Sequence, residues 1–267
     1  MKFKMPEKPN ISRRAVTVLL FALTLPILLA SFIFGMFFLC RVGDFKIVGE
    51  IAHYSEEELI EATGIKAGER LYFIDSAGAE SALKENFPRI KSVKVSPSWF
   101  TSVKITVEEE SPKYYSEVNG DYYLLNEDFR VIDMSKSFGE FKDEAIMLSF
   151  QTSGAYTFKE AVLGERVVFV SEKAEKKMSD FIEEIESFDF GDFGVSALGF
   201  RDGGTQFDAY IVLDGRLRII LGNTTDIPEK IRKSLQRLAE QDADFEFGEI
   251  IVYDINEISF RKIDSIE

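Results

Sequence analysis

The chain has 267 residues, of which 45% are hydrophobic and 25 are phenylalanine, so it can build one large or two small cores and is not generally disordered. One cysteine excludes an intrachain disulfide framework, and one histidine removes most of the usual general bases and metal ligands. The net charge is -14 although residues 1–14 carry five basic side chains and one acidic, so the remainder carries -18. Such an acidic body repels phosphates and disfavours nucleic-acid binding.

Residues 15–40 contain no charged side chain. As a helix rising about 1.5 Å per residue the segment reaches about 39 Å, enough to cross a hydrocarbon core of about 30 Å. It is longer than a signal peptide's apolar region and lacks a small-residue cleavage site, which predicts an uncleaved signal anchor. Cys40 is interpreted as a small apolar residue at the interface. The basic residues 1–14 predict a cytoplasmic tail, an exported body and a single-pass type II topology.

Residues 44–112 predict a compact α+β module. In chain order we expect a strand at 45–50, a helix with Ser55 and Glu58 as a capping box and Gly64 at its end, a short apolar strand at 71–74, a helix at 76–87 stopped by Pro88, and a hairpin at 93–107 turning near Pro97. Its principal elements therefore follow the order β-α-α-β-β.

Residues 113–262 predict a β-rich α+β domain with an antiparallel sheet, followed by a short tail at 263–267. The elements expected are a hairpin at Asn119-Gly120, loop and short strands at 135–157, an amphipathic helix at 171–188 with Met178, Phe181, Ile182 and Ile185 on its apolar face, a hairpin at Asp214-Gly215, a helix with Asp226 as N-cap and Glu229 at the box position, and terminal strands at 248–254 and 257–262.

Catalytic motifs give little support to an enzyme. Residues 188–194 contain Asp-Phe-Gly twice, but the kinase phosphate loop and catalytic loop are absent, so we interpret the segment as an aromatic linker. His53 has no second ligand at a useful spacing and is expected to be a surface turn residue. No nucleophile-elbow, zinc-protease or P-loop motif occurs. Hydrolysis by two carboxylates in a cleft stays open at this point. We expect no catalytic residue, cofactor or metal.

Four stretches, "FKIVGE", "GIKAGERLYFID", "FPRIKSVKV" and "ITVEEESP", make residues 44–112 resemble a POTRA domain. With the flanking segments, about residues 10 to 262 resemble the FtsQ/DivIB family of bacterial division proteins. The last stretch fits the family pattern Ile-x-Val-x-Glu-x-x-Pro through Ile105, Val107, Glu109 and Pro112. Glu110 departs from it, since a basic residue is common there.

The resemblance implies a non-enzymatic bitopic scaffold at the division septum. It would hold FtsL and FtsB/DivIC-type proteins together and help regulate septal peptidoglycan synthesis, without binding nucleic acid or a small-molecule substrate. The partner-binding residues expected on the terminal strands are Ile251, Tyr253, Ser259, Phe260 and Arg261; alternatively, Ile251, Tyr253 and Phe260 are core residues of one sheet face. Two other functions are a POTRA-type chaperone or secretion component and, less favoured, a membrane-tethered cell-wall hydrolase.

Overall fold

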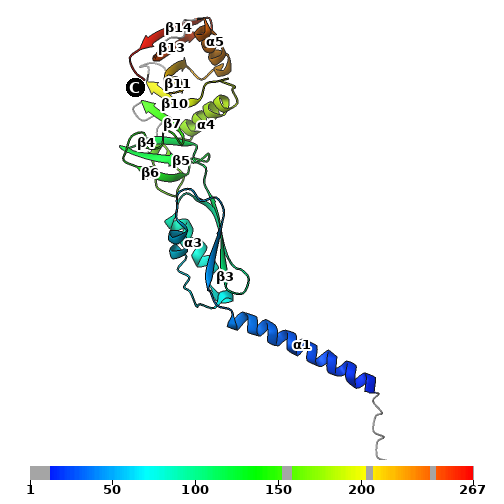
Figure 1. Cartoon of the computed structure of the whole chain (residues 1–267). Coiled ribbons are helices and arrows are strands. Elements are labelled where there is room, and N and C mark those ends of the chain that lie inside the picture. The colour runs from blue at the N-terminus through cyan, green and yellow to red at the C-terminus, as the bar shows by residue number, and fades with distance from the viewer. Residues whose placement is uncertain (1–12, 152–157, 203–206, 241–244, 267) are drawn as a thin grey trace, which may run out of the picture. The chain divides into compact units, whose positions relative to one another are not determined.

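The computed structural model describes residues 13–151, 158–202, 207–240 and 245–266. The chain divides into two compact units, with the boundary between Glu109 and Glu110 (Figure 1). The expected basic tail lies outside the described residues, except for its last two positions.

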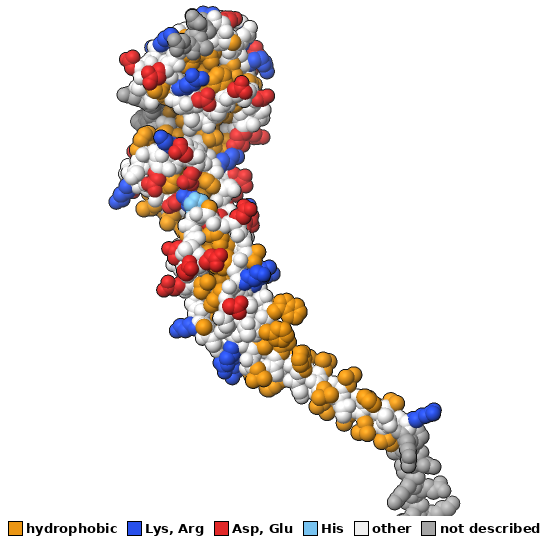
Figure 2. Space-filling view, in the orientation of Figure 1, with side chains coloured by type: hydrophobic (Ala, Val, Ile, Leu, Met, Phe, Trp, Pro, Cys, Tyr) orange, Lys and Arg blue, Asp and Glu red, His pale blue; other side chains and the backbone are white. Residues whose placement is uncertain are grey.

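Helix α1 (Arg13–Leu39) opens the first unit. Its segment Val16–Met36 is long and apolar enough to cross a membrane, and the described residues bury none of its most apolar part. Figure 2 shows hydrophobic side chains along the length of this helix. The Thr24 hydroxyl donates to the Leu20 carbonyl at 2.9 Å, close to the proline inside the helix. The helix fits a single-pass anchor.

A three-stranded sheet and two helices complete the first unit. The elements are β1 (Asp44–Val48), α2 (Glu56–Ala62), the 3₁₀ helix η1 (Leu71–Phe73), α3 (Ser76–Asn86), β2 (Ile90–Pro97) and β3 (Ser102–Glu109). The strand order is β1-β3-β2, with β1 parallel and β2 antiparallel to β3. Leu59 of α2 and Leu83 of α3 are fully buried in one cluster with the strands. The predicted β-α-α-β-β order is confirmed.

The expected strand at 71–74 is wrong, because this segment forms η1. Leu71 is fully buried, and its N–H donates to the Cys40 carbonyl at 3.0 Å. Arg70, just before the segment, takes part in an isolated β-bridge with Arg41, and the segment itself is not a strand. The Asp75 carboxylate then accepts from the Gly78 N–H at 2.9 Å and starts α3. The short segment between the buried Leu71 and the helix cap Asp75 therefore forms a single 3₁₀ turn.

The first helix of the domain is capped as predicted. The Ser55 hydroxyl accepts from the Glu58 N–H at 3.3 Å, while the Ser55 N–H donates to the Glu58 carboxylate at 2.9 Å. These hydrogen bonds from the Ser55 backbone and hydroxyl lower the pKa of Glu58. Gly64 follows the helix with φ +67°, the left-handed conformation expected at its end.

The Ile-x-Val-x-Glu pattern has a physical role in this domain. The Glu109 carboxylate accepts from the N–H groups of Ala52 and His53 at 3.3 and 3.4 Å, and lies 2.9 Å from His53 Nδ1. Gly49 has φ +139°, and a Cβ there would lie 2.0 Å from the Val107 carbonyl oxygen. The end of β3 therefore fixes the loop after β1, and His53 is a turn residue.

A nine-stranded sheet forms the second unit. The elements are β4 (Tyr114–Val118), β5 (Asp121–Leu125), β6 (Val131–Ser135), β7 (Ile146–Gln151), β8 (Phe158–Glu160), β9 (Val168–Phe169), α4 (Glu172–Glu186), β10 (Val195–Asp202), β11 (Phe207–Leu213), β12 (Leu217–Gly222), α5 (Ile227–Ala239), β13 (Phe247–Asp254) and β14 (Glu257–Ile263). The order in the sheet is β14-β13-β12-β11-β10-β7-β4-β5-β6, while β8 and β9 pair separately.

The α+β fold class is confirmed, but the large sheet is mixed and not purely antiparallel. Among the described strands, β4 and β7, β7 and β10, and β12 and β13 run parallel, while the other five neighbouring pairs are antiparallel. Parallel neighbours need long crossover connections. Helix α4 lies in the connection from β7 to β10, and α5 in that from β12 to β13.

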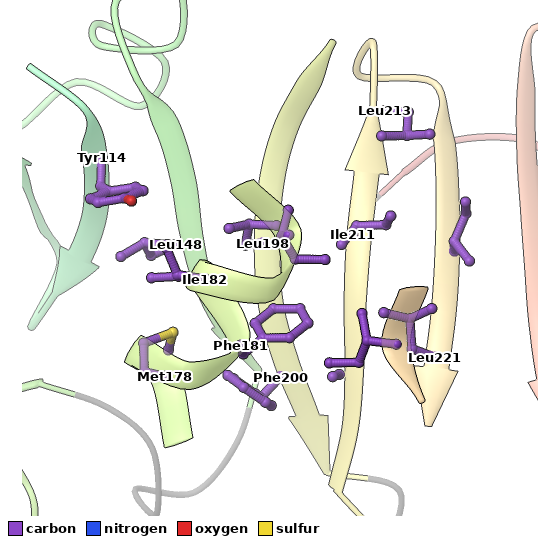
Figure 3. Packing of buried hydrophobic residues seen from close by; sticks show 14 of the residues in the cluster. Tyr114, Leu148, Met178, Phe181, Ile182, Leu198, Phe200, Ile211, Leu213 and Leu221 are labelled. Atoms are coloured by element: carbon purple, nitrogen blue, oxygen red, sulfur yellow. The ribbon is translucent and has the colours of Figure 1, made fainter. Parts of the chain in front are cut away.

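Helices α4 and α5 pack on the same side of this sheet. The predicted apolar face of α4 is confirmed, since Met178, Phe181, Ile182 and Ile185 are all buried. Figure 3 shows Phe181 next to Phe200 of β10, and their ring centroids are 5.2 Å apart. Three phenylalanines of the aromatic linker, Phe188, Phe190 and Phe193, pack against the same core.

The start of α5 differs from the prediction. Asp226 adopts φ +55° and makes no side-chain cap, because this left-handed backbone does not direct its carboxylate to the helix N–H groups. Glu229 pairs instead with Arg232. Lys230 Nζ donates to the Asn223 carbonyl at 2.8 Å and thereby ties the preceding loop to the helix; burial lowers the pKa of this lysine.

Candidate partner-binding edge

Strand β14 is one of the two outer strands of the large sheet. It pairs on its inner side with β13, which sets Ile251 opposite Ser259, Ile250 opposite Phe260 and Glu249 opposite Arg261. Among the described residues no strand pairs with its outer side. An outer strand of this kind presents unpaired backbone N–H and C=O groups, which can accept another strand.

The five predicted partner-binding residues fall into two groups. Tyr253 is 66% exposed, and Ser259 and Arg261 are also exposed. Ile251 is half-buried against Tyr210, Val212 and Ile220, on the face away from α4 and α5.

Phe260 faces the main core. Its ring is half-buried, with its centroid 5.3 Å from that of Phe245. Ile251 and Phe260 are therefore both partly buried, but on opposite faces of the sheet, and Tyr253 is exposed, so the three are not core residues of one sheet face.

A buried carboxylate holds the outer strand in place. Glu249 of β13 is fully buried, and its Oε1 accepts from Arg218 Nε of β12 at 2.8 Å. Its Oε2 accepts from Arg261 Nε of β14 at 2.7 Å and from a second nitrogen of the same guanidinium. The side chain of Arg218 is 14% exposed and that of Arg261 is 60% exposed. Glu249 thus joins β12, β13 and β14 across one face of the sheet. The N–H groups of Arg261 that face Glu249 are hydrogen-bonded within the chain.

Helix α5 borders the other face of β14. Lys233, Gln236 and Arg237 of the helix line a shallow hollow of about 470 Å³ together with Asn256 and Ile258 of the terminal hairpin. Lys233 Nζ donates to Asn256 Oδ1 at 3.3 Å. The rim is charged, since Glu240 also lines the hollow and pairs with Arg237 at 3.1 Å. The sequence does not reveal this hollow, because the position of the helix beside β14 depends on the tertiary fold.

Two other outer strands, β6 and β2, carry contacts made by the chain itself. At the opposite edge of the large sheet, the Val131 N–H of β6 donates to the Glu165 carbonyl at 2.8 Å, and the Gly164 N–H donates to the Val131 carbonyl at 2.9 Å. In the first unit the Val95 N–H of β2 donates to the Glu80 carboxylate at 2.8 Å. Covering an edge in this way prevents it from pairing with another chain. The edge of β14 is therefore the better candidate.

The arrangement at β14 offers means of binding another chain. Within the described ranges, no group of three or more His, Cys, Asp and Glu side chains is placed to hold a metal ion. The chemistry at β14 consists of backbone hydrogen-bonding groups, exposed polar side chains and a charged rim, which are means of recognising a peptide segment.

Comparison with known proteins identifies a domain in the first unit. Residues 40–110 match the FtsQ-type POTRA domain family. The chain is therefore a POTRA-domain protein with an apolar helix ahead of that domain.

A curated relative, the cell division protein DivIB of Clostridium botulinum, is 22% identical over 141 residues, which cover 53% of this chain and 52% of the relative. The match thus spans about half of the relative's length. The POTRA-domain match and this relative together support an assignment to the FtsQ/DivIB family of cell division proteins.

Proposed function

We propose that the chain is a non-enzymatic scaffold of bacterial cell division, anchored by α1 with its N-terminus in the cytoplasm and its two folded units outside. It acts at the septum, where it holds small bitopic proteins of the FtsL and FtsB/DivIC types together and helps regulate septal peptidoglycan synthesis. The POTRA-domain match and the DivIB relative support the division role, and the apolar helix supports the anchoring. The observation that carries the binding mechanism is the unpaired outer side of β14.

Binding occurs by strand addition. A partner segment pairs with the outer side of β14 through main-chain hydrogen bonds, and its alternate side chains point to opposite faces of the sheet. On one face they meet Ser259 and the outer part of Arg261. On the other face they meet Ile258 and the charged rim formed by Lys233, Arg237 and Glu240. We therefore expect a partner strand with apolar side chains over Ile258 and polar side chains toward α5.

Anchoring lowers the affinity that each contact must supply. When both proteins are held in one membrane, the second contact forms at a raised effective concentration. The modest side-chain surface of β14 is then sufficient, since the backbone ladder gives the affinity and the rim gives selectivity.

Site-specific crosslinking in dividing cells tests this mechanism. A photo-reactive benzoylphenylalanine replaces Ser259 of β14 in one variant of the full chain and Met134 of β6 in a control, because Met134 is a 46% exposed residue on the opposite outer strand. We expect crosslinks to a small bitopic division protein from position 259 and none from position 134. Equal crosslinking from both positions, or none from position 259 in cells that make the partners, contradicts strand addition at β14.

The division role has its own test. A fluorescently tagged full chain is expected to concentrate at the septum of dividing cells. An even distribution around the cell contradicts the scaffold role, whatever the crosslinking result.

A further inference from the structure

We propose a second membrane contact in the first unit: the aromatic side chains Phe73, Trp99 and Phe100 insert into the interfacial layer of the same bilayer that holds α1. All three are exposed to a degree unusual for large apolar residues, at 60%, 80% and 55% of their surfaces. Clustered exposed apolar side chains mark a binding surface. The proposal commits to a lipid surface as the occupant, for the reasons that follow.

The first reason is the short, hydrogen-bonded connection from the anchor to this surface. Gly43 lies four residues after the end of α1, and its N–H donates to the Thr101 carbonyl at 2.7 Å. Thr101 follows Trp99 and Phe100 in the turn between β2 and β3. The chain cannot carry this turn far from the bilayer, because four residues span at most about 14 Å.

The second reason concerns η1. The ring centroids of Phe73 and Phe38 are 5.7 Å apart, and Phe38 belongs to the last turn of α1. The span Val16–Met36 fills the hydrocarbon layer, so Phe38 lies at the level of the headgroups. Phe73 therefore lies at that level too. Figure 2 shows hydrophobic side chains gathered at the end of the domain from which α1 leaves.

The third reason is the chemistry around the three rings. Aromatic and arginine side chains are the residues that favour the membrane–water interface. Arg70 places its guanidinium 5.2 Å from the Phe38 ring centroid, and Arg41 donates to the Gly68 carbonyl at 2.7 Å. Both arginines are exposed at this end of the domain and can reach lipid phosphates. The nearby Asp44 carboxylate accepts a hydrogen bond from the Ser102 hydroxyl at 2.8 Å.

The turn holds its aromatic residues outward. Phe100 has φ +53°, a left-handed conformation that is uncommon for an aromatic residue. The Ser98 N–H donates to the Ser102 carbonyl at 2.7 Å, which closes the turn below the rings. The ring centroids of Trp99 and Phe100 are 6.1 Å apart, so they form one apolar tip.

The single tryptophan of the chain makes a direct test possible. The full chain is reconstituted into vesicles of phosphatidylcholine and phosphatidylglycerol, with or without bromine atoms on the upper acyl chain. Trp99 is not part of α1, so its emission reports on the domain alone. We expect brominated lipid to remove most of the Trp99 emission, and the water-soluble quencher acrylamide to have little effect.

A matched control moves the tryptophan to the second unit. The W99F/F138W protein carries its reporter at Phe138, which is 74% exposed and lies between β6 and β7. Acrylamide should quench this protein, and brominated lipid should not. The proposal is overturned if Trp99 emits as a solvated indole and is insensitive to brominated lipid, or if brominated lipid quenches both proteins equally. This result does not depend on partner binding at β14.

Discussion

The buried carboxylate Glu249 allows a quantitative test of how β14 is held. The E249A substitution leaves Arg218, whose side chain is only 14% exposed, without its counter-charge. Removing one partner of a buried ion pair costs about 3–5 kcal/mol, because the remaining charge stays desolvated. The R261A substitution leaves the pair of Glu249 and Arg218 intact and removes a largely exposed side chain, so a cost of about 1 kcal/mol is expected.

Hydrogen exchange and urea unfolding of the full chain in detergent micelles measure both effects. E249A should lower the free energy of unfolding of the second unit and remove the protection of the β13–β14 amides, while R261A should loosen β14 alone. The double substitution R218M/E249L should recover most of the loss, since apolar groups of similar volume can replace a buried ion pair. Equal losses in E249A and R261A, or full protection in E249A, would refute the idea that this carboxylate fastens the outer strand.

Two further predictions concern other parts of the chain. G49A should lower the free energy of unfolding of the first unit by more than about 2 kcal/mol, since the new Cβ meets the Val107 carbonyl oxygen at φ +139°; G64N, in open space at φ +67°, should cost about 1 kcal/mol or less, and similar losses in thermal unfolding would contradict this reasoning. Although burial raises the pKa of Glu186, hydrogen bonds led by that from Lys113 at 2.7 Å leave it lowered, so its contribution to stability is present at neutral pH and lost as the pH falls through the folded pKa. K113M should therefore be less stable at neutral pH and converge with the unsubstituted chain on acidification, as measured by urea unfolding over this pH range; a constant difference would exclude the linkage.

Local signals in the sequence were sufficient for turns and caps. The Asn119-Gly120 and Asp214-Gly215 pairs both form hairpin turns with positive φ, because these residue types tolerate the left-handed backbone that tight hairpins need. The box of Ser55 and Glu58 forms for an equally local reason. Asp226 shows the limit of such signals, since the same spacing gives no cap where the preceding loop imposes another backbone conformation.

The arrangement of the large sheet could not be predicted in the same way. Which strands become neighbours depends on the crossovers through α4 and α5, and the terminal strand pattern alone fixes neither register nor direction. Nothing in "GEIIVYD" distinguishes Glu249 as a buried charge, because its two arginine partners come from other strands. Arg261, one of the expected partner-binding residues, donates to the Glu249 carboxylate of its own chain.

The open edge of β14 is itself an argument for a partner. Unpaired strands promote aggregation, and folded proteins usually cover them, shorten them or place charges along them. This chain covers β6 with the 164–165 backbone and caps an amide of β2 with Glu80. Among the described residues β14 has no such cover, although its residues are firmly fixed to β13 through Glu249 and Arg261. An outer strand that is held firmly and that the described residues leave uncovered is an efficient template, because a binding segment then bears the ordering cost alone.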